Sequence, residues 1–156
     1  MRFSDLLDIK CIDLSLVANE KEDVIHSMVA KLADAGYIQN IEKAQQAVIE
    51  RENALSTGVG QGVAVPHATL EDLVEPRVAF ARTQKGVSFN SIDGEPVHLV
   101  FLLLAPENEI SLHLKLLSRV SRLCYNPELR QALMGAESAE VVMDVFRTFE
   151  AKHLEL

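Results

Sequence analysis

The residues best suited to chemistry lie together in one stretch of the chain, residues 51–67. Arg51 is followed by a segment with three glycines at alternate positions, and the segment ends in Pro66-His67. Glycines allow a backbone to turn sharply and to bring its N–H groups close to an anion. Imidazole is a nucleophile and a leaving group near neutral pH. This combination predicts a phosphoryl group carried on a histidine nitrogen.

His67 is the predicted nucleophile. Pro66 fixes its own φ and restricts the residue before it, so the backbone that presents the imidazole is stiff. In-line transfer gains from a nucleophile that is held in a fixed position. A lone histidine after a strand is more often a partly exposed polar residue. The glycines, Pro66 and the upstream Arg51 are what favour a functional role.

The glycine segment is expected to offer backbone N–H and hydroxyl donors beside His67, although taken alone it could be a flexible connector. No lysine follows it, which excludes the GxxxxGK[ST] nucleotide loop, and its glycine spacing differs from GxGxxG. A zinc site would need a third ligand beside His67 and His113, so no metal is predicted. The candidate phosphate-binding residues are Ser56, Thr57, Gly58, Gly60 and Gly62.

Two further side chains are candidates for the same site. Helical spacing places Arg51 at the end of a helix that begins after Asn40, facing the glycine segment. Its guanidinium could offset the charge of a phosphoryl group through paired hydrogen bonds. His113 falls in a leucine-rich helix, where a histidine is usually an edge-of-core residue. It gains a role only if that helix packs against the segment that carries His67.

The remaining patterns alternate between helix and strand and predict a layered α/β domain. A first helix is expected from a cap at Asn19 to a stop at Gly36. The strand over 97–104 is almost continuously apolar, which is typical of a central strand covered on both faces. The other expected elements are strands over 63–65 and 77–83 and helices over 109–124, 127–135 and from a cap at Ser138.

Composition narrows the class of protein. A chain of 156 residues is expected to form a single domain, residues 1–156, and its net charge of −8 argues against a nucleic-acid partner. No apolar run approaches the roughly 20 residues that span a bilayer. The first residues lack the apolar core of a signal peptide, so a cytoplasmic location without membrane insertion is expected. Cys11 and Cys124 are expected to remain thiols.

The string STGVGQGVAVPH, residues 56–67, resembles the enzyme IIA domain of the sugar phosphotransferase system, in its fructose/mannitol/nitrogen-regulatory branch. Arg51-Glu52 and His113-Leu114-x-Leu116-Leu117-Ser118 belong to the same resemblance, which covers essentially the whole chain. It implies a three-layer α/β/α domain with a mixed sheet flanked by helices. It also implies that no nucleotide, metal or organic cofactor is used.

The resemblance further implies a phosphoryl relay. His67 would accept phosphate through Nε2 from phospho-HPr or its nitrogen-branch paralogue, with His113 and Arg51 lining the site. It would pass the group to an enzyme IIB cysteine, or keep it as a signal to a regulated kinase or transporter. A separate chain of this length favours the nitrogen-regulatory type. The alternatives are a soluble IIA subunit of a fructose/mannitol-type transporter and an anion-binding domain without turnover, and dimer formation is left open.

Overall fold

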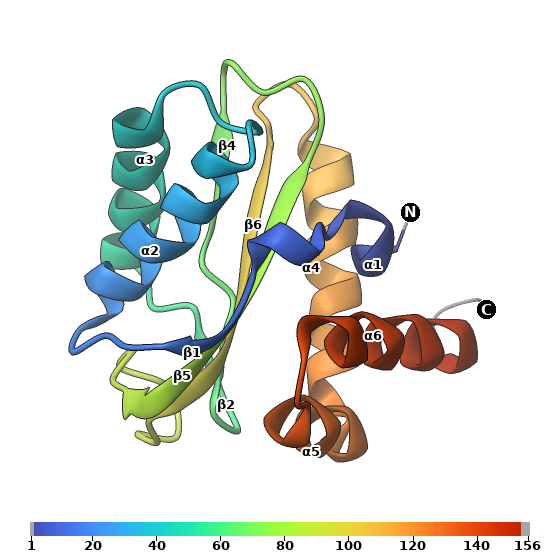
Figure 1. Ribbon diagram of the computed structural model, residues 1–156. Coiled ribbons are helices and arrows are strands. Elements are labelled where there is room, and N and C mark those ends of the chain that lie inside the picture. Colours follow the sequence, from blue (N-terminus) through green and yellow to red (C-terminus); the bar gives the residue numbers. More distant parts are fainter. Residues whose placement is uncertain (1, 154–156) are drawn as a thin grey trace.

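The computed structural model describes residues 2–153. Six strands form one mixed sheet in the order β1-β5-β6-β3-β2, and β4 also pairs with β6 (Figure 1). Strand β6 is antiparallel to β5 and parallel to β3 and β4. The strands span Ile12–Leu16 (β1), Gly58–Gly60 (β2), Val63–Ala64 (β3), His67–Leu70 (β4), Arg77–Val87 (β5) and Val97–Pro106 (β6).

Helices cover both faces of this sheet. Helices α2 and α3 pack on one face, whereas α4, α5 and α6 lie on the other (Figure 1). The predicted three-layer α/β/α architecture with a mixed sheet is therefore confirmed. The helices span Phe3–Leu6 (α1), Lys21–Asp34 (α2), Ile41–Ala54 (α3), Ile110–Tyr125 (α4), Pro127–Gly135 (α5) and Ala139–His153 (α6), and a short 3-10 helix spans Ile9–Cys11.

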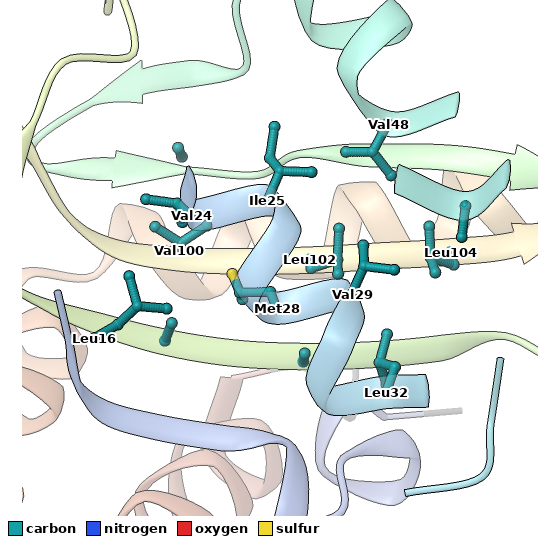
Figure 2. Close-up of a cluster of buried hydrophobic side chains, with 14 of the residues drawn as sticks. Leu16, Val24, Ile25, Met28, Val29, Leu32, Val48, Val100, Leu102 and Leu104 are labelled. Carbon is teal, nitrogen blue, oxygen red and sulfur yellow. The ribbon is translucent and has the colours of Figure 1, made fainter. Parts of the chain in front are cut away.

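Strand β6 is the central strand that its apolar sequence predicts, and every residue in it except His98 is buried. Its side chains alternate between two hydrophobic clusters because successive residues of a strand point to opposite faces. Figure 2 shows the cluster beneath α2 and α3. The residues of β6 in that cluster include Val100, Leu102 and Leu104, and those in the opposite cluster include Leu99, Phe101 and Leu103.

The start of α2 differs from the prediction. The helix begins at Lys21, and the residue before it, Glu20, is extended and forms the cap. The Glu20 N–H donates to the Asp23 carboxylate at 3.2 Å. The sequence offers the same spacing one residue earlier, with Asn19 as the cap and Glu22 three positions later. The expected cap at Asn19 is therefore wrong by one residue, because Glu20 and Asp23 form the capping box instead.

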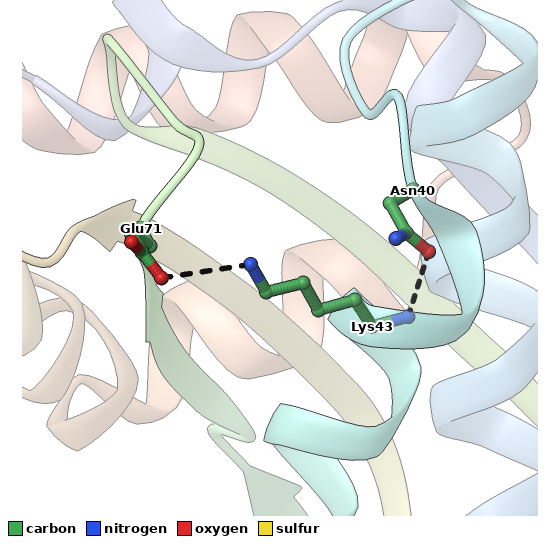
Figure 3. A network of polar contacts seen from close by, with 3 residues as sticks. All are labelled: Asn40, Lys43 and Glu71. Carbon is green, nitrogen blue, oxygen red and sulfur yellow. Dashed lines mark hydrogen bonds and ion pairs between the residues drawn. The ribbon is translucent and has the colours of Figure 1, made fainter.

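Helix α3 begins where the sequence predicts. The Asn40 side chain caps it by accepting a hydrogen bond from the backbone N–H of Lys43 at 3.1 Å. The Lys43 ammonium lies 3.8 Å from the carboxylate of Glu71, just after β4 (Figure 3). These contacts set the start of α3, and its last turn then carries Arg51 and Glu52.

The largest error of the sequence prediction concerns strands beside the glycine segment. Residues 58–60, expected to be a loop, form strand β2, and the strand expected to stop at Pro66 continues beyond it as β4. Propensity argues against both assignments, because glycine and proline are depleted in strands. Pairing with β3 and β6 outweighs that local preference. Strand β1, at the opposite edge, was also not predicted.

The core on the α4 side contains a cluster of four phenylalanines. The Phe101 ring lies 5.1 Å from that of Phe80 and 5.8 Å from that of Phe146, and Phe3 completes the group. Edge-to-face packing of this kind adds to the free energy of burial. Since Phe3 belongs to α1, the cluster also attaches the beginning of the chain to the sheet.

Replacing Phe101 with alanine should lower the free energy of unfolding by about 3–5 kcal/mol, because it leaves a cavity in a closely packed core. Chemical denaturation of the purified variant measures the loss. The matched control is Tyr125→Ala, which removes an aromatic ring that is 87% exposed, and it should change stability by less than about 0.5 kcal/mol. Equal losses in the two variants would contradict this packing.

Candidate functional site

His67 is the first residue of β4, and the strand pairing explains where its side chain points. Val63 pairs with Leu99 and His67 pairs with Leu103, so β3 and β4 follow β6 in a single register. The interruption falls at Pro66, which lacks the N–H that a strand would use. Because the register is kept, Val63, Val65 and His67 face the same side of the sheet, the side covered by α4.

The His67 imidazole is fixed by its own backbone. Its Nδ1 lies 2.8 Å from the carbonyl oxygen of Val65. A carbonyl can only accept, so Nδ1 carries the proton in this hydrogen bond and Nε2 has the free lone pair. Burial lowers the pKa of His67, and the nearby charge of Arg51 lowers it further, while the Val65 hydrogen bond and the charge of Glu52 oppose that shift. The neutral, nucleophilic form is therefore favoured at physiological pH.

His113 lies next to His67. It belongs to α4, and the centroids of the two imidazole rings are 5.2 Å apart. The side chain is buried, and its Nδ1 has no hydrogen-bond partner. Burial lowers the pKa of His113 to about 4, and the charges of His67 and Arg51 act in the same direction. The sequence assigned His113 a role only if its helix packs against the segment that carries His67, and α4 does pack there.

Arg51 lies in the last turn of α3 and is half-buried. Its guanidinium donates a hydrogen bond to the carbonyl of Leu55 at 2.9 Å, which holds it over the end of its own helix. Its positive charge lowers the pKa of both His67 and His113. The structure thus brings together the two imidazoles and the guanidinium that the sequence singled out.

The hydroxyl and amide groups at the start of the glycine segment have partners within the protein. The Ser56 hydroxyl donates to the carbonyl of Phe89, and the Gly58 N–H donates to Ser56 Oγ at 3.0 Å. The Thr57 N–H and hydroxyl both donate to the carboxylate of Glu52. The expectation of free donors beside His67 therefore needs correction, since these groups hold the segment in place.

The remaining glycines lie at the turn between β2 and β3. Gly60 and Gly62 have positive φ values of 93° and 77°, and Gln61 between them donates its N–H to Asp93 at 2.9 Å. Gly60 pairs with Val63. Val63 lies four residues before His67, which at about 3.3 Å per residue places Gly60 roughly 13 Å from His67 along the strand direction. Gly60 and Gly62 thus form a hairpin turn, and they do not form the predicted cradle around His67.

Sequence reasoning gave no role to Glu52, which is only 2% exposed. Its position beside Arg51 was visible, but a glutamate in the last turn of an amphipathic helix is ordinarily exposed. The signal that could have identified it is helical spacing: Glu52 follows the buried Val48 by four residues and so shares its face.

Among the side chains that the structure describes, those of residues 2–152, no three histidine, cysteine or acidic groups are close enough together to bind a metal ion. The same part of the chain contains no helix with the length and apolar character needed to cross a membrane. What the site does offer is a neutral imidazole with one free nitrogen, a second neutral imidazole and a guanidinium. Such a set can accept an electrophilic group on nitrogen and offset negative charge on it.

Comparison with known proteins agrees with this chemistry. Residues 5–148 match the family described as the phosphoenolpyruvate-dependent sugar phosphotransferase system, EIIA 2. The crystal structure of the nitrogen regulatory protein IIA-Ntr from Neisseria meningitidis superposes with a TM-score of 0.86 and 31% identity, covering 92% of this chain and 97% of that one. This chain belongs to the EIIA 2 family. It is an EIIA-type phosphocarrier of the phosphotransferase system.

The curated relatives carry two kinds of name. The nitrogen regulatory protein of Bradyrhizobium diazoefficiens is 36% identical over 93% of this chain and 94% of its own length. The fructose-specific EIIA component of Haloferax volcanii is 37% identical over 90% of this chain and 96% of its own length. The fructose-specific EIIABC component of Bacillus subtilis is 39% identical over 93% of this chain, which spans only 23% of that protein.

The lowered pKa of His113 predicts a pH dependence of stability. The unfolded chain binds a proton at His113 as the pH falls through about 6.5, whereas the folded protein does so only near 4. The free energy of unfolding should therefore decrease as the pH is lowered from 6.5 to 4. The decrease should be smaller in His113→Gln, as measured by urea denaturation at a series of pH values. Parallel curves for the two proteins would contradict the assignment.

Proposed function

We propose that this chain is a nitrogen-type regulatory IIA that accepts a phosphoryl group on Nε2 of His67 from phospho-HPr or its nitrogen-branch paralogue. The observation that carries the proposal is the Nδ1 hydrogen bond to Val65, which leaves Nε2 as the free nitrogen. The similarity to nitrogen regulatory proteins over nearly the full length of both chains supports the regulatory type. In this role residues 1–156 act as one domain in the cytoplasm.

The transfer needs no proton movement at His67. The lone pair of Nε2 attacks phosphorus as the N–P bond of the donor phosphohistidine breaks, and that electron pair returns to the donor nitrogen. The donor ring, protonated on its other nitrogen, leaves as neutral imidazole, while the proton of His67 stays on Nδ1, where it is hydrogen-bonded to the Val65 carbonyl. Catalysis then requires positioning and charge stabilisation.

In this proposal Arg51 and His113 stabilise the phosphoryl group. The guanidinium of Arg51 offsets the charge that develops on the phosphoryl oxygens. His113 is neutral at physiological pH because burial lowers its pKa to about 4. A neutral imidazole has one N–H to donate to a phosphoryl oxygen. The segment that includes Ser56, Thr57 and Gly58 acts indirectly, by holding the backbone on which His67 sits.

Incubation with a phosphorylated HPr-type carrier should add one acid-labile, base-stable phosphate to the protein. We expect His67→Ala to abolish the labelling, because it removes the acceptor nitrogen. His113→Ala should still be labelled but should transfer poorly, because the charge on phosphorus is less well stabilised. The control is His26→Ala, which removes an exposed histidine of α2 and should label as the wild type does. Failure of the wild type to label with any such donor would refute the proposal.

A second candidate function is that of a soluble IIA subunit that passes phosphate from His67 to an enzyme IIB cysteine. The similarity to the Haloferax volcanii fructose-specific EIIA component over 96% of that protein favours it. In the regulatory case, phosphorylation adds a charge of about −2 beside the site and should change the affinity for a kinase or transporter.

Pull-down experiments with the wild type and His67→Asp distinguish these two functions. The regulatory type predicts different sets of partners for the two proteins, because the substituted carboxylate imitates part of the added charge. Identical partner sets at matched concentrations, together with rapid loss of phosphate to an enzyme IIB domain, would instead support the transporter subunit.

A further inference from the structure

Glu52 is a buried carboxylate that the transfer step does not use directly. It lies in the last turn of α3, next to Arg51, and is 2% exposed. Its Oε2 accepts the backbone N–H of Thr57 at 2.9 Å, and its Oε1 accepts the hydroxyl of the same residue. A buried charge is costly unless it is hydrogen-bonded, so this pair of bonds must be kept for the carboxylate to remain inside.

The bonds from Glu52 are the end of a longer chain of hydrogen bonds. The Thr57 carbonyl accepts the N–H of Val65 at 3.0 Å. The Val65 carbonyl in turn accepts Nδ1–H of His67 at 2.8 Å. Each link passes through the backbone of one residue, because Thr57 donates its N–H to Glu52 and accepts from Val65, and Val65 accepts from His67. The carboxylate is thereby linked to the imidazole through two residues.

We propose that Glu52 is a positioning residue for phosphoryl acceptance, which acts through Thr57 and Val65 to keep His67 with its proton on Nδ1 and its Nε2 free. The effect of Glu52 on phosphoryl transfer rests on the proposed function. The orientation and protonation of His67 that it describes exist before any donor arrives.

The charges around His67 explain why an acid is suited to this position. A ring that bears a proton on Nδ1 and phosphorus on Nε2 is formally cationic. Glu52 favours a cationic ring, because its negative charge raises the pKa of His67. Arg51 and His113 face His67 from α3 and α4, and a positive Arg51 disfavours a cationic ring while it favours the phosphoryl oxygens. Arg51 and Glu52 thus stabilise opposite ends of the phosphorylated histidine.

The test compares Glu52→Gln with Glu50→Gln, which alters an exposed glutamate two residues earlier in the same helix. The ¹⁵N chemical shifts of the His67 ring, followed over a pH titration without any donor, report the tautomer and the pKa. In Glu52→Gln we expect a larger share of the Nε2–H tautomer and a lower pKa of His67. Glu50→Gln should give the wild-type signals.

Phosphoryl uptake is then measured with a phosphorylated HPr-type carrier. We expect Glu52→Gln to be about tenfold slower than the wild type, because a charged hydrogen-bond acceptor behind the nucleophile is lost. Unchanged ring shifts and pKa in a folded Glu52→Gln protein would overturn the positioning role. Wild-type protein that shows the expected tautomer but takes no phosphate from any donor would refute the proposed function and leave the positioning role standing.

If Glu52→Gln does not fold, a second pair of variants tests the positioning role of Glu52. Thr57→Val removes the hydroxyl that bonds Glu52, whereas Thr57→Ser keeps it. The valine variant should shift the His67 ring toward the Nε2–H tautomer, and the serine variant should retain the wild-type shifts. The same ring signals in both variants would contradict the proposal.

Discussion

The hydrogen bond between Nδ1 of His67 and the carbonyl of Val65 is the interaction on which the site depends. It selects one tautomer, and it turns the ring so that Nε2 is the nitrogen left without an internal partner. Much of the surrounding fold keeps that carbonyl in place. The common register of β3 and β4 along β6 sets the position of the backbone, and the Thr57 carbonyl holds the N–H of Val65.

The electrostatics of the site depend on its position at the edge of the core. Burial between β4 and α4 lowers the pKa of both imidazoles, so neither competes for protons near neutral pH. Arg51 and Glu52, consecutive in the sequence, carry opposite charges to this place from the end of one helix. A capped start at Asn40 and the buried face of α3 are what bring that helix end to the site.

Sequence patterns predicted a layered α/β domain, because helix and strand signals alternate, and the central strand, because residues 97–104 are almost continuously apolar. The three layers and the mixed sheet were implied by the family resemblance. Sequence patterns also selected His67, His113 and Arg51, which the structure brings together. Patterns failed where tertiary pairing outweighed local preference, at the glycine-rich β2 and at the continuation past Pro66. Glycines that were expected to surround an anion instead form a hairpin turn held by Asp93. Helical spacing after Val48 could have indicated that Glu52 is buried, but its bond to Thr57 could not be predicted, because only the folded chain brings the two groups together.

The central claim is that Nε2 of His67 is the atom that carries phosphorus, and its most direct test is to locate the N–P bond. Protein labelled with ¹⁵N in its histidines can be phosphorylated by an HPr-type carrier and studied through the ring nitrogen shifts and their coupling to phosphorus. The account predicts coupling to Nε2 of His67, with the proton retained on Nδ1. Phosphorus on Nδ1 of His67, or on any other residue, would contradict it.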